Sequence, residues 1–311
     1  GRALKMYFVK TYLKQDNVNM LRWVEFKPEG KFEQHKTFLA DKVSAAQNIL
    51  LVVHGIIGNT ETILKELVIG AKLQEKFDLV LSFDYENLKT PISDTGLDLK
   101  KKLEAAGIGD NDNKKLTVLA HSMGGLVSRW CIEREGGNRM VDHLVMCGTP
   151  NNGSPFGKVE LVRKLINTLT VLTMNYFPAL IPFNGAIMLA LNRSKKITPT
   201  LEQMDAGSEF IKNLNSSSDP GVRYSILAGN VEEYNDPADH GFAKLLAKTG
   251  KSVLFTAMFG NSAHDIAASV DSVLGIDAAR NPMPKRMNVP CHHLNYFFSE
   301  VGQKALLGVE W

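Results

Sequence analysis

The sequence has few cysteines, little net charge and no long unbroken apolar run. Its 3 cysteines, Cys131, Cys147 and Cys291, are scattered without the spacing of a metal site and are too few for a disulfide framework. So low a count favours a reducing compartment, and we expect a cytoplasmic protein. The formal net charge of +3 is too small to indicate a nucleic-acid partner. No metal or nucleic acid is therefore expected.

The most apolar part of the chain, residues 165–191, is not predicted to span a membrane. Pro178, Pro182 and Gly185 interrupt it, and a spanning helix needs an unbroken apolar stretch. Contact with a membrane surface and the oligomeric state stay open. No basic segment followed by an apolar run and a cleavage site opens the chain. It starts at Gly1 rather than at a methionine, which is compatible with a place in a larger protein.

What the chain does contain is an alternation of apolar strands and amphipathic helices. Strands are expected at residues 48–53, 79–83, 116–120, 141–147, 222–228 and 287–291, with one or two peripheral strands within 4–26. Helices are expected at residues 60–76, 94–106 and 123–134. This alternation predicts an α/β protein with a mostly parallel sheet covered by helices on both faces. Sites in such sheets form at the carboxyl ends of the strands.

The alternation breaks twice, and we interpret both breaks as insertions in a single domain of residues 1–311. Residues 151–218 lack clear strands and predict a helical cap, or lid, over the sheet. Residues 230–252 suggest a second insertion. The apolar residues of the cap have two interpretations that do not exclude each other. They form a cap core, or they line a cleft for an acyl chain.

Residues 116–125 carry the strongest functional signal. A β-type run ends on Ser122, and small residues, Ala120 and Gly124, lie two positions to either side. A tight strand-to-helix turn of this kind exposes a serine as a nucleophile. Glycine is usual at both flanking positions, so Ala120 is a mild departure. The alternative is an ordinary Ser-Gly loop after a buried strand.

An oxyanion hole is predicted beside this serine. His54 and Gly55 follow the first buried strand, and a flexible His-Gly pair there lets the next N–H, that of Ile56, turn toward Ser122. The N–H of Met123 would be the second donor. Because Met123 begins a helix, the helix dipole there also favours negative charge.

With these motifs the chain resembles the lipase and esterase branch of the α/β-hydrolase family, and within it bacterial triacylglycerol-lipase-type and inositol-deacylase-like hydrolases. The resemblance is strongest over residues 48–156. It rests on His54-Gly55-Ile56-Ile57-Gly58, His121-Ser122-Met123-Gly124-Gly125-Leu126-Val127, Gly148-Thr149-Pro150-Asn151-Asn152-Gly153-Ser154-Pro155, and the segments 205–210 and 214–215. It implies a three-layer fold with a lid, a serine nucleophile and no cofactor.

The resemblance also implies that a catalytic acid and then a histidine follow Ser122 in the chain. The acids available after residue 222 are Asp236, Asp239, Asp265, Asp271 and Asp277. Asp265 fits the family pattern best, with Ser269 after it, although His264 and Ile266 replace the usual neighbours; Asp271 is its main rival. The family register selects His293 as the base, ahead of His292.

Other polar residues receive structural interpretations. We expect His54 to brace the oxyanion loop, His121 to pack beside the serine turn, and Asp84 to cap or turn the chain, with substrate contact or an acid role as its alternative. Asp236, Asp239 and His240 could suggest a metal, but their loop-like context favours a solvated turn.

The sequence therefore predicts a serine-dependent carboxyl-ester hydrolase acting on a small-molecule or lipid ester through an acyl-enzyme. An acyltransferase with the same triad stays open, because both reactions share that intermediate. A non-catalytic interaction module that keeps the fold stays open too, since the residues around Asp265 depart from the family pattern.

Overall fold

The computed structural model describes residues 19–56, 58–110, 113–155, 164–165, 168, 198–235, 239 and 253–311. Its centre is an eight-stranded sheet in the order β2-β1-β4-β3-β5-β6-β7-β8. The strands are β1 (Met20–Lys27), β2 (Lys31–His35), β3 (Asn48–Val53), β4 (Leu79–Asp84), β5 (Lys115–His121), β6 (His143–Cys147), β7 (Arg223–Gly229) and β8 (Lys285–Val289). From β4 to β8 neighbouring strands are parallel, and β1 is antiparallel to both β2 and β4.

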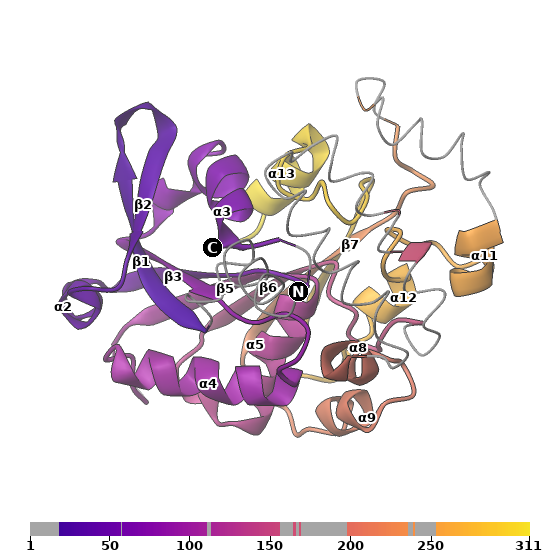
Figure 1. The fold of residues 1–311 in the computed structure, drawn as a ribbon, viewed down its shortest axis with the longest axis horizontal. Helices are drawn as coiled ribbons and strands as arrows, with labels where there is room; N and C mark the ends of the chain where they lie inside the picture. The colour runs from indigo at the N-terminus through magenta and orange to yellow at the C-terminus, as the bar shows by residue number, and fades with distance from the viewer. Residues whose placement is uncertain are drawn as a thin grey trace, which may run out of the picture.

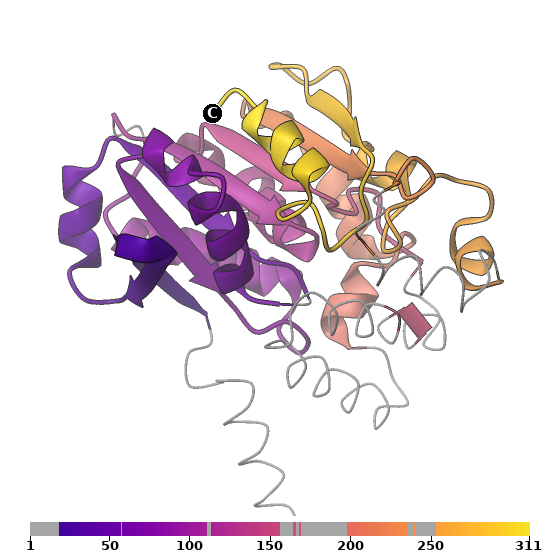
Figure 2. The same cartoon turned by 90° about the horizontal axis from the view of Figure 1, so that it is seen from above.

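Helices cover both faces of this sheet (Figures 1 and 2). The described helices are α2 (Leu39–Ala45), α3 (Thr60–Ile63), α4 (Ile92–Ala105), α5 (Met123–Arg134), α8 (Pro199–Gln203), α9 (Glu209–Asn215), α11 (Val253–Phe259), α12 (Val270–Val273) and α13 (Glu300–Leu307). Short 3₁₀ turns are η2 (Pro28–Gly30), η4 (Leu73–Lys76) and η5 (Gly137–Arg139), and η3 (Leu64–Ile69) is π-helical. Within the described ranges, no helix is both long and apolar enough to cross a bilayer.

The apolar run of β3 shows how the layers are held together. Ile49, Leu51 and Val53 face a core shared with α4 and α5, whereas Leu50 and Val52 face a second core shared with α3, η3 and α13. A strand buried on both faces has no polar alternation, which is why these strands are continuous apolar runs in the sequence. The structure confirms the predicted α/β class with its mostly parallel sheet.

One expected helix is wrong. Residues 60–76 do not form a single helix but divide into α3, the π-helical η3 and the 3₁₀ turn η4. Lys72 has a left-handed backbone, with φ at 57°, which ends the helical path before η4. Most of the predicted cap, at residues 156–197, and of the second insertion, at residues 236–252, lies outside the described residues. The domain boundaries stay predictions.

A buried ion cluster fixes α5, the helix that begins just after Ser122, to its surroundings. The carboxylate of Glu133 is fully buried, and it accepts from Arg129 Nε at 2.7 Å, Arg280 Nη2 at 2.7 Å and the Tyr224 hydroxyl at 2.8 Å. Burial would raise the pKa of Glu133, but the two guanidinium groups outweigh it and lower the pKa to about 2. Arg129 also reaches Asn215 Oδ1 on α9, at 3.0 Å.

We expect Glu133→Gln to lower the free energy of unfolding by about 3–5 kcal/mol at neutral pH, because it leaves two buried guanidinium groups without a counter-charge. Urea unfolding measures the loss. Glu209→Gln is the matched control, since Glu209 pairs with Lys212 at the exposed surface and its loss should cost about 1 kcal/mol or less. Equal losses in the two variants would contradict this account.

The same cluster predicts an acid dependence. The lowered pKa means that Glu133 contributes stability above its ordinary value of 4.5, and that this contribution is lost as the pH falls toward about 2. The difference in stability between the native protein and Glu133→Gln should therefore shrink across that range.

Candidate active site

Ser122 lies in a strained turn between β5 and α5. Its φ of 54° and ψ of −127° lie outside the conformations that side-chain-bearing residues ordinarily adopt. The turn requires Gly124, because a Cβ there would lie 2.3 Å from the carbonyl oxygen of His54. Ala120, the mild departure from the family pattern, is a fully buried residue of β5 whose partners in the sheet are Val53 and Met146.

Three of the predicted residues meet at this turn. His293 Nε2 lies 2.9 Å from the Ser122 hydroxyl oxygen, and His293 Nδ1 lies 2.7 Å from Asp265 Oδ2. An ionised carboxylate only accepts hydrogen bonds, so Nδ1 carries the ring proton and Nε2 is free to accept from the serine. All three residues are buried or nearly so. The arrangement allows proton transfer from the serine to the ring.

The environment of Asp265 keeps it charged. Its Oδ1 accepts from the N–H groups of Ala267 at 2.9 Å and Ala268 at 2.8 Å. Burial would raise the pKa of Asp265, but the nearby His293 and these N–H groups outweigh it, so the pKa lies below its ordinary value. Ile266, where the family often has glycine, takes a φ of 82°, so the acid loop keeps a left-handed residue despite a β-branched side chain.

The two rival residues lie elsewhere. Asp271 is exposed in the first turn of α12. The His292 ring is turned toward Asp239 Oδ2, at 3.3 Å, and accepts at Nδ1 from the N–H of Leu294. The structure thus brings Asp265 and His293 to the serine, and neither Asp271 nor His292.

The predicted oxyanion donors flank the serine. A Cβ on Gly55 would lie 2.8 Å from Ser122 Cβ, so the loop before Ile56 packs directly against Ser122. Met123 N–H is at the first position of α5, where no partner exists within the helix. Within the described part of the chain, neither this N–H nor that of Ile56 has a recorded acceptor.

Residues that follow β4 hold the oxyanion loop, and the sequence patterns missed two of them. The Tyr85 hydroxyl donates to the carbonyl of His54 at 2.6 Å, and Asn87 Nδ2 donates to the carbonyl of Ile56 at 2.9 Å. Asn87 and His54 Nδ1 both reach the carbonyl of Gly55. Because a peptide unit is planar and trans, fixing that carbonyl fixes the opposite direction for the Ile56 N–H.

The remaining polar residues make structural contacts. His121 Nε2 bonds the carbonyl oxygen of His293 at 2.8 Å, and burial followed by the neighbouring His293 lowers the pKa of His121 to about 3. Asp84 accepts from the N–H of Thr60 at 3.0 Å, at the start of α3, and pairs with Arg22 at 2.9 Å. His121 and Asp84 therefore stabilise neighbouring backbone and contact no nucleophile.

Two groups of titratable side chains bear on metal binding. The first is the group that the sequence suggested, Asp236, Asp239 and His240. Asp236 and His240 lie outside the described residues, and the carboxylate of Asp239 accepts from the Tyr234 hydroxyl at 2.6 Å.

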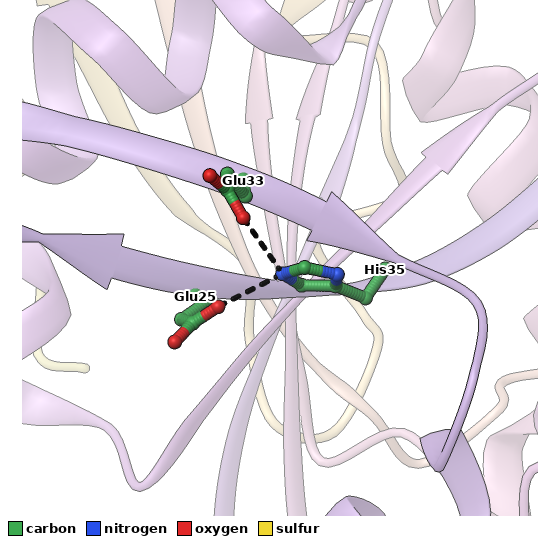
Figure 3. Close-up of side chains that lie close together, drawn as sticks. All are labelled: Glu25, Glu33 and His35. Atoms are coloured by element: carbon green, nitrogen blue, oxygen red, sulfur yellow. Dashed lines mark hydrogen bonds and ion pairs between the residues drawn. The ribbon is translucent and has the colours of Figure 1, made fainter.

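The other group is Glu25, Glu33 and His35 on the edge hairpin, whose ligand atoms lie within 4.8 Å of one another (Figure 3). Lys27 Nζ lies 3.0 Å from Glu25 and 3.8 Å from Glu33. Lys27 and His35 both lie beside these two carboxylates, and the group is an ion-pair network at the surface.

Comparisons with known proteins place the fold. A family model described as a domain of unknown function (DUF7379) matches residues 16–309. Among curated proteins no match is found. The mature Bacillus licheniformis lipase BlEst2 is similar in structure, with 18% identity and a TM-score of 0.52 over 85% of this chain and 90% of the lipase.

Two further structures are similar at lower identity. EstA from Clostridium botulinum is 13% identical, with a TM-score of 0.52 over 84% of this chain and 86% of EstA. A structure from work on carboxylesterases of Nitrososphaera gargenis is 14% identical, with a TM-score of 0.50 over 91% of this chain and 96% of that one. At these identities the likeness establishes an α/β-hydrolase-like fold.

Proposed function

We propose that this chain, which belongs to the DUF7379 family, is a serine-dependent carboxyl-ester hydrolase. The observation that carries the proposal is the continuous line from Ser122 through His293 to Asp265, with contacts of 2.9 and 2.7 Å. Three segments far apart in the sequence supply these groups at the carboxyl edge of the sheet. Each group has the hydrogen-bond partner that nucleophilic catalysis requires.

In the proposed reaction, Ser122 Oγ attacks the ester carbonyl carbon while His293 Nε2 takes the hydroxyl proton. The tetrahedral oxyanion is held by the N–H groups of Ile56 and Met123. When the intermediate collapses, the bond to the leaving oxygen breaks, and His293 returns the proton to the departing alcohol. Water then attacks the acyl-enzyme by the same route, which releases the carboxylic acid and restores Ser122. Asp265 stabilises the imidazolium ring in both half-reactions.

We propose an ester with an apolar acyl group as the substrate. The support is compositional, because residues 165–191 of the predicted cap (residues 151–218) are rich in apolar residues, and apolar pockets favour aliphatic or aromatic groups. No cofactor has a step in this mechanism. We propose hydrolysis rather than transfer to another alcohol, because transfer requires a binding site for the acceptor alcohol and hydrolysis by water does not.

A fluorophosphonate probe tests the nucleophile directly. We expect the probe to label the native protein on the peptide that contains Ser122, as located by mass spectrometry, because only an activated serine in an assembled oxyanion hole reacts readily. Heat-unfolded protein is the control and should stay unlabelled. Native protein that stays unlabelled would favour the non-catalytic interaction module.

The same preparation separates hydrolase from acyltransferase. With a short p-nitrophenyl ester and a competing alcohol, a hydrolase yields mainly the free acid. If the main product is the new ester, the proposed reaction is acyl transfer rather than hydrolysis. The acyl-enzyme intermediate is then still part of the mechanism.

A further inference from the structure

The hydroxyl of Tyr296 lies directly behind the acid of the proposed triad. Tyr296 is fully buried, three residues after His293, on the loop that follows β8. Its hydroxyl oxygen is 3.1 Å from Asp265 Oδ2 and 2.6 Å from the backbone nitrogen of Gly229. Tyr296 is the aromatic residue of the family register that selects His293, but nothing in the proposed mechanism uses its hydroxyl.

The two contacts fix the direction of the hydroxyl proton. A backbone N–H only donates, so the Tyr296 oxygen accepts from Gly229. An ionised carboxylate only accepts, so the single hydroxyl proton is directed to Asp265. The hydroxyl and His293 Nδ1–H therefore donate to the same oxygen, Oδ2.

This hydroxyl completes the set of donors around a wholly buried carboxylate. The N–H groups of Ala267 and Ala268 bond Oδ1, and His293 and Tyr296 bond Oδ2. A buried charge is costly unless hydrogen bonds replace its lost hydration. With Tyr296, each carboxylate oxygen has two donors, so neither is left with a single partner.

Two glycines allow Tyr296 and Asp265 to approach each other closely. A Cβ on Gly229 would lie 2.8 Å from both the Tyr296 hydroxyl and Asp265 Cβ. A Cβ on Gly148 would lie 2.8 Å from Asp265 Oδ2 and 2.9 Å from the Tyr296 ring. The site has no room for a Cβ on either glycine, so the Tyr296 ring and the Asp265 carboxylate keep their close contact.

We propose that Tyr296 is a positioning residue of the triad, whose hydroxyl holds Asp265 Oδ2 in line with His293 Nδ1 and shares the charge of the carboxylate. The inference rests on the proposed ester-hydrolase function. Removing the hydroxyl concentrates negative charge on the bond to His293 and leaves Oδ2 less firmly held. The first effect stabilises the protonated ring, and the second slows each proton transfer.

Other titratable groups near the pair do not obscure this effect. Burial lowers the pKa of three neighbouring histidines and raises that of two cysteine thiols, so all are neutral near pH 7; these groups are His121, His264, His292, Cys147 and Cys291. Burial and then the charge of Asp265 raise the pKa of Tyr296 itself, which keeps its proton. We therefore expect the acid limb of the activity profile to report on the Asp265–His293 pair.

The experiment compares Tyr296→Phe with Tyr224→Phe. Tyr224 is the matched control, because it is equally buried and its hydroxyl also donates to a buried carboxylate, that of Glu133, at 2.8 Å. For Tyr296→Phe we expect kcat on a p-nitrophenyl ester to fall about tenfold at nearly unchanged KM. The acid limb of kcat/KM should move up by about 0.5 pH unit. Tyr224→Phe should lower Tm and leave kcat and the profile unchanged.

Replacing Tyr296 by 3-fluorotyrosine keeps the ring in place if Tyr296→Phe fails to fold. Its more acidic hydroxyl is a stronger donor, so the acid limb should move to lower pH. The proposal would be overturned if the Phe and fluorotyrosine variants of Tyr296 change Tm alone, which is the result expected for Tyr224→Phe. The low-field proton resonance of His293 Nδ1–H gives a readout without turnover. If that resonance shifts in Tyr296→Phe while the native protein hydrolyses no ester, the positioning role stands and the proposed function falls.

Discussion

Replacing Ser122 by alanine should lower kcat for a short p-nitrophenyl ester by about 10⁶-fold, to a rate near that of the uncatalysed reaction with residual help from binding. The alanine removes the only atom that forms the acyl-enzyme bond and leaves His293 with no proton to take. The fold should survive, because Ser122 contributes a small, buried hydroxyl whose side-chain contact is His293 Nε2. Steady-state kinetics measure the loss, and circular dichroism checks the fold.

Ser128→Ala is the control for this experiment. Ser128 is equally small and buried on α5, and its hydroxyl donates to the carbonyl of Gly124 at 2.8 Å, one turn earlier in the same helix. Its loss should change kcat little, because the helix keeps its backbone bonds. Retained activity in Ser122→Ala would remove this serine as the nucleophile, whatever the fold.

Asp265→Asn should lower kcat about 10⁴-fold, the second largest effect we expect. An asparagine can present an N–H to His293 Nδ1, which then accepts, so the proton moves to Nε2 and blocks transfer from the serine. The shape of the site is kept, and the loss lies in the tautomer of the ring. Parallel kinetics on Asp271→Asn complete the comparison, and activity there should be close to that of the native protein because Asp271 is exposed.

The comparison of these two aspartates is informative, because both follow the same strand and the sequence offers Asp271 as the main rival of Asp265. A large loss in Asp271→Asn with a small one in Asp265→Asn would show that the 2.7 Å contact to His293 is not the working one. Comparable large losses would point to a loop that folds as a unit, in which Ile266 at a φ of 82° is the residue under strain.

Much of the fold could be predicted because buried strands are recognisable locally. The runs at residues 48–53 and 116–120 became β3 and β5 within a residue at each end, and residues 123–134 became α5. The single helix predicted at residues 60–76 was wrong, because apolar spacing alone does not show that the backbone of Lys72 is left-handed. Strand β2 has no apolar run, because it is the edge partner of β1 and is largely exposed.

The residues of the site likewise divide into those that the sequence could identify and those that it could not. The motif around Ser122 and the His-Gly pair before Ile56 could be identified locally, because a tight turn and a close backbone approach demand small residues at fixed spacing. Tyr85, Asn87 and the role of the Tyr296 hydroxyl could not, because each acts through a hydrogen bond to a distant segment. The separation between Tyr296 and Gly229, for example, is 67 residues.

The sequence by itself determined the class of the fold and the tight turn that presents Ser122, together with the kinds of residue that the proposed chemistry requires. Only the tertiary structure decided which carboxylate and which histidine join it. The sequence ranks Asp265 ahead of Asp271 and His293 ahead of His292, but whether these residues meet depends on distances across segments 28 and 171 residues apart. Those distances follow from how parallel strands align their carboxyl ends at one edge, a property of the packed sheet that no short stretch of chain contains.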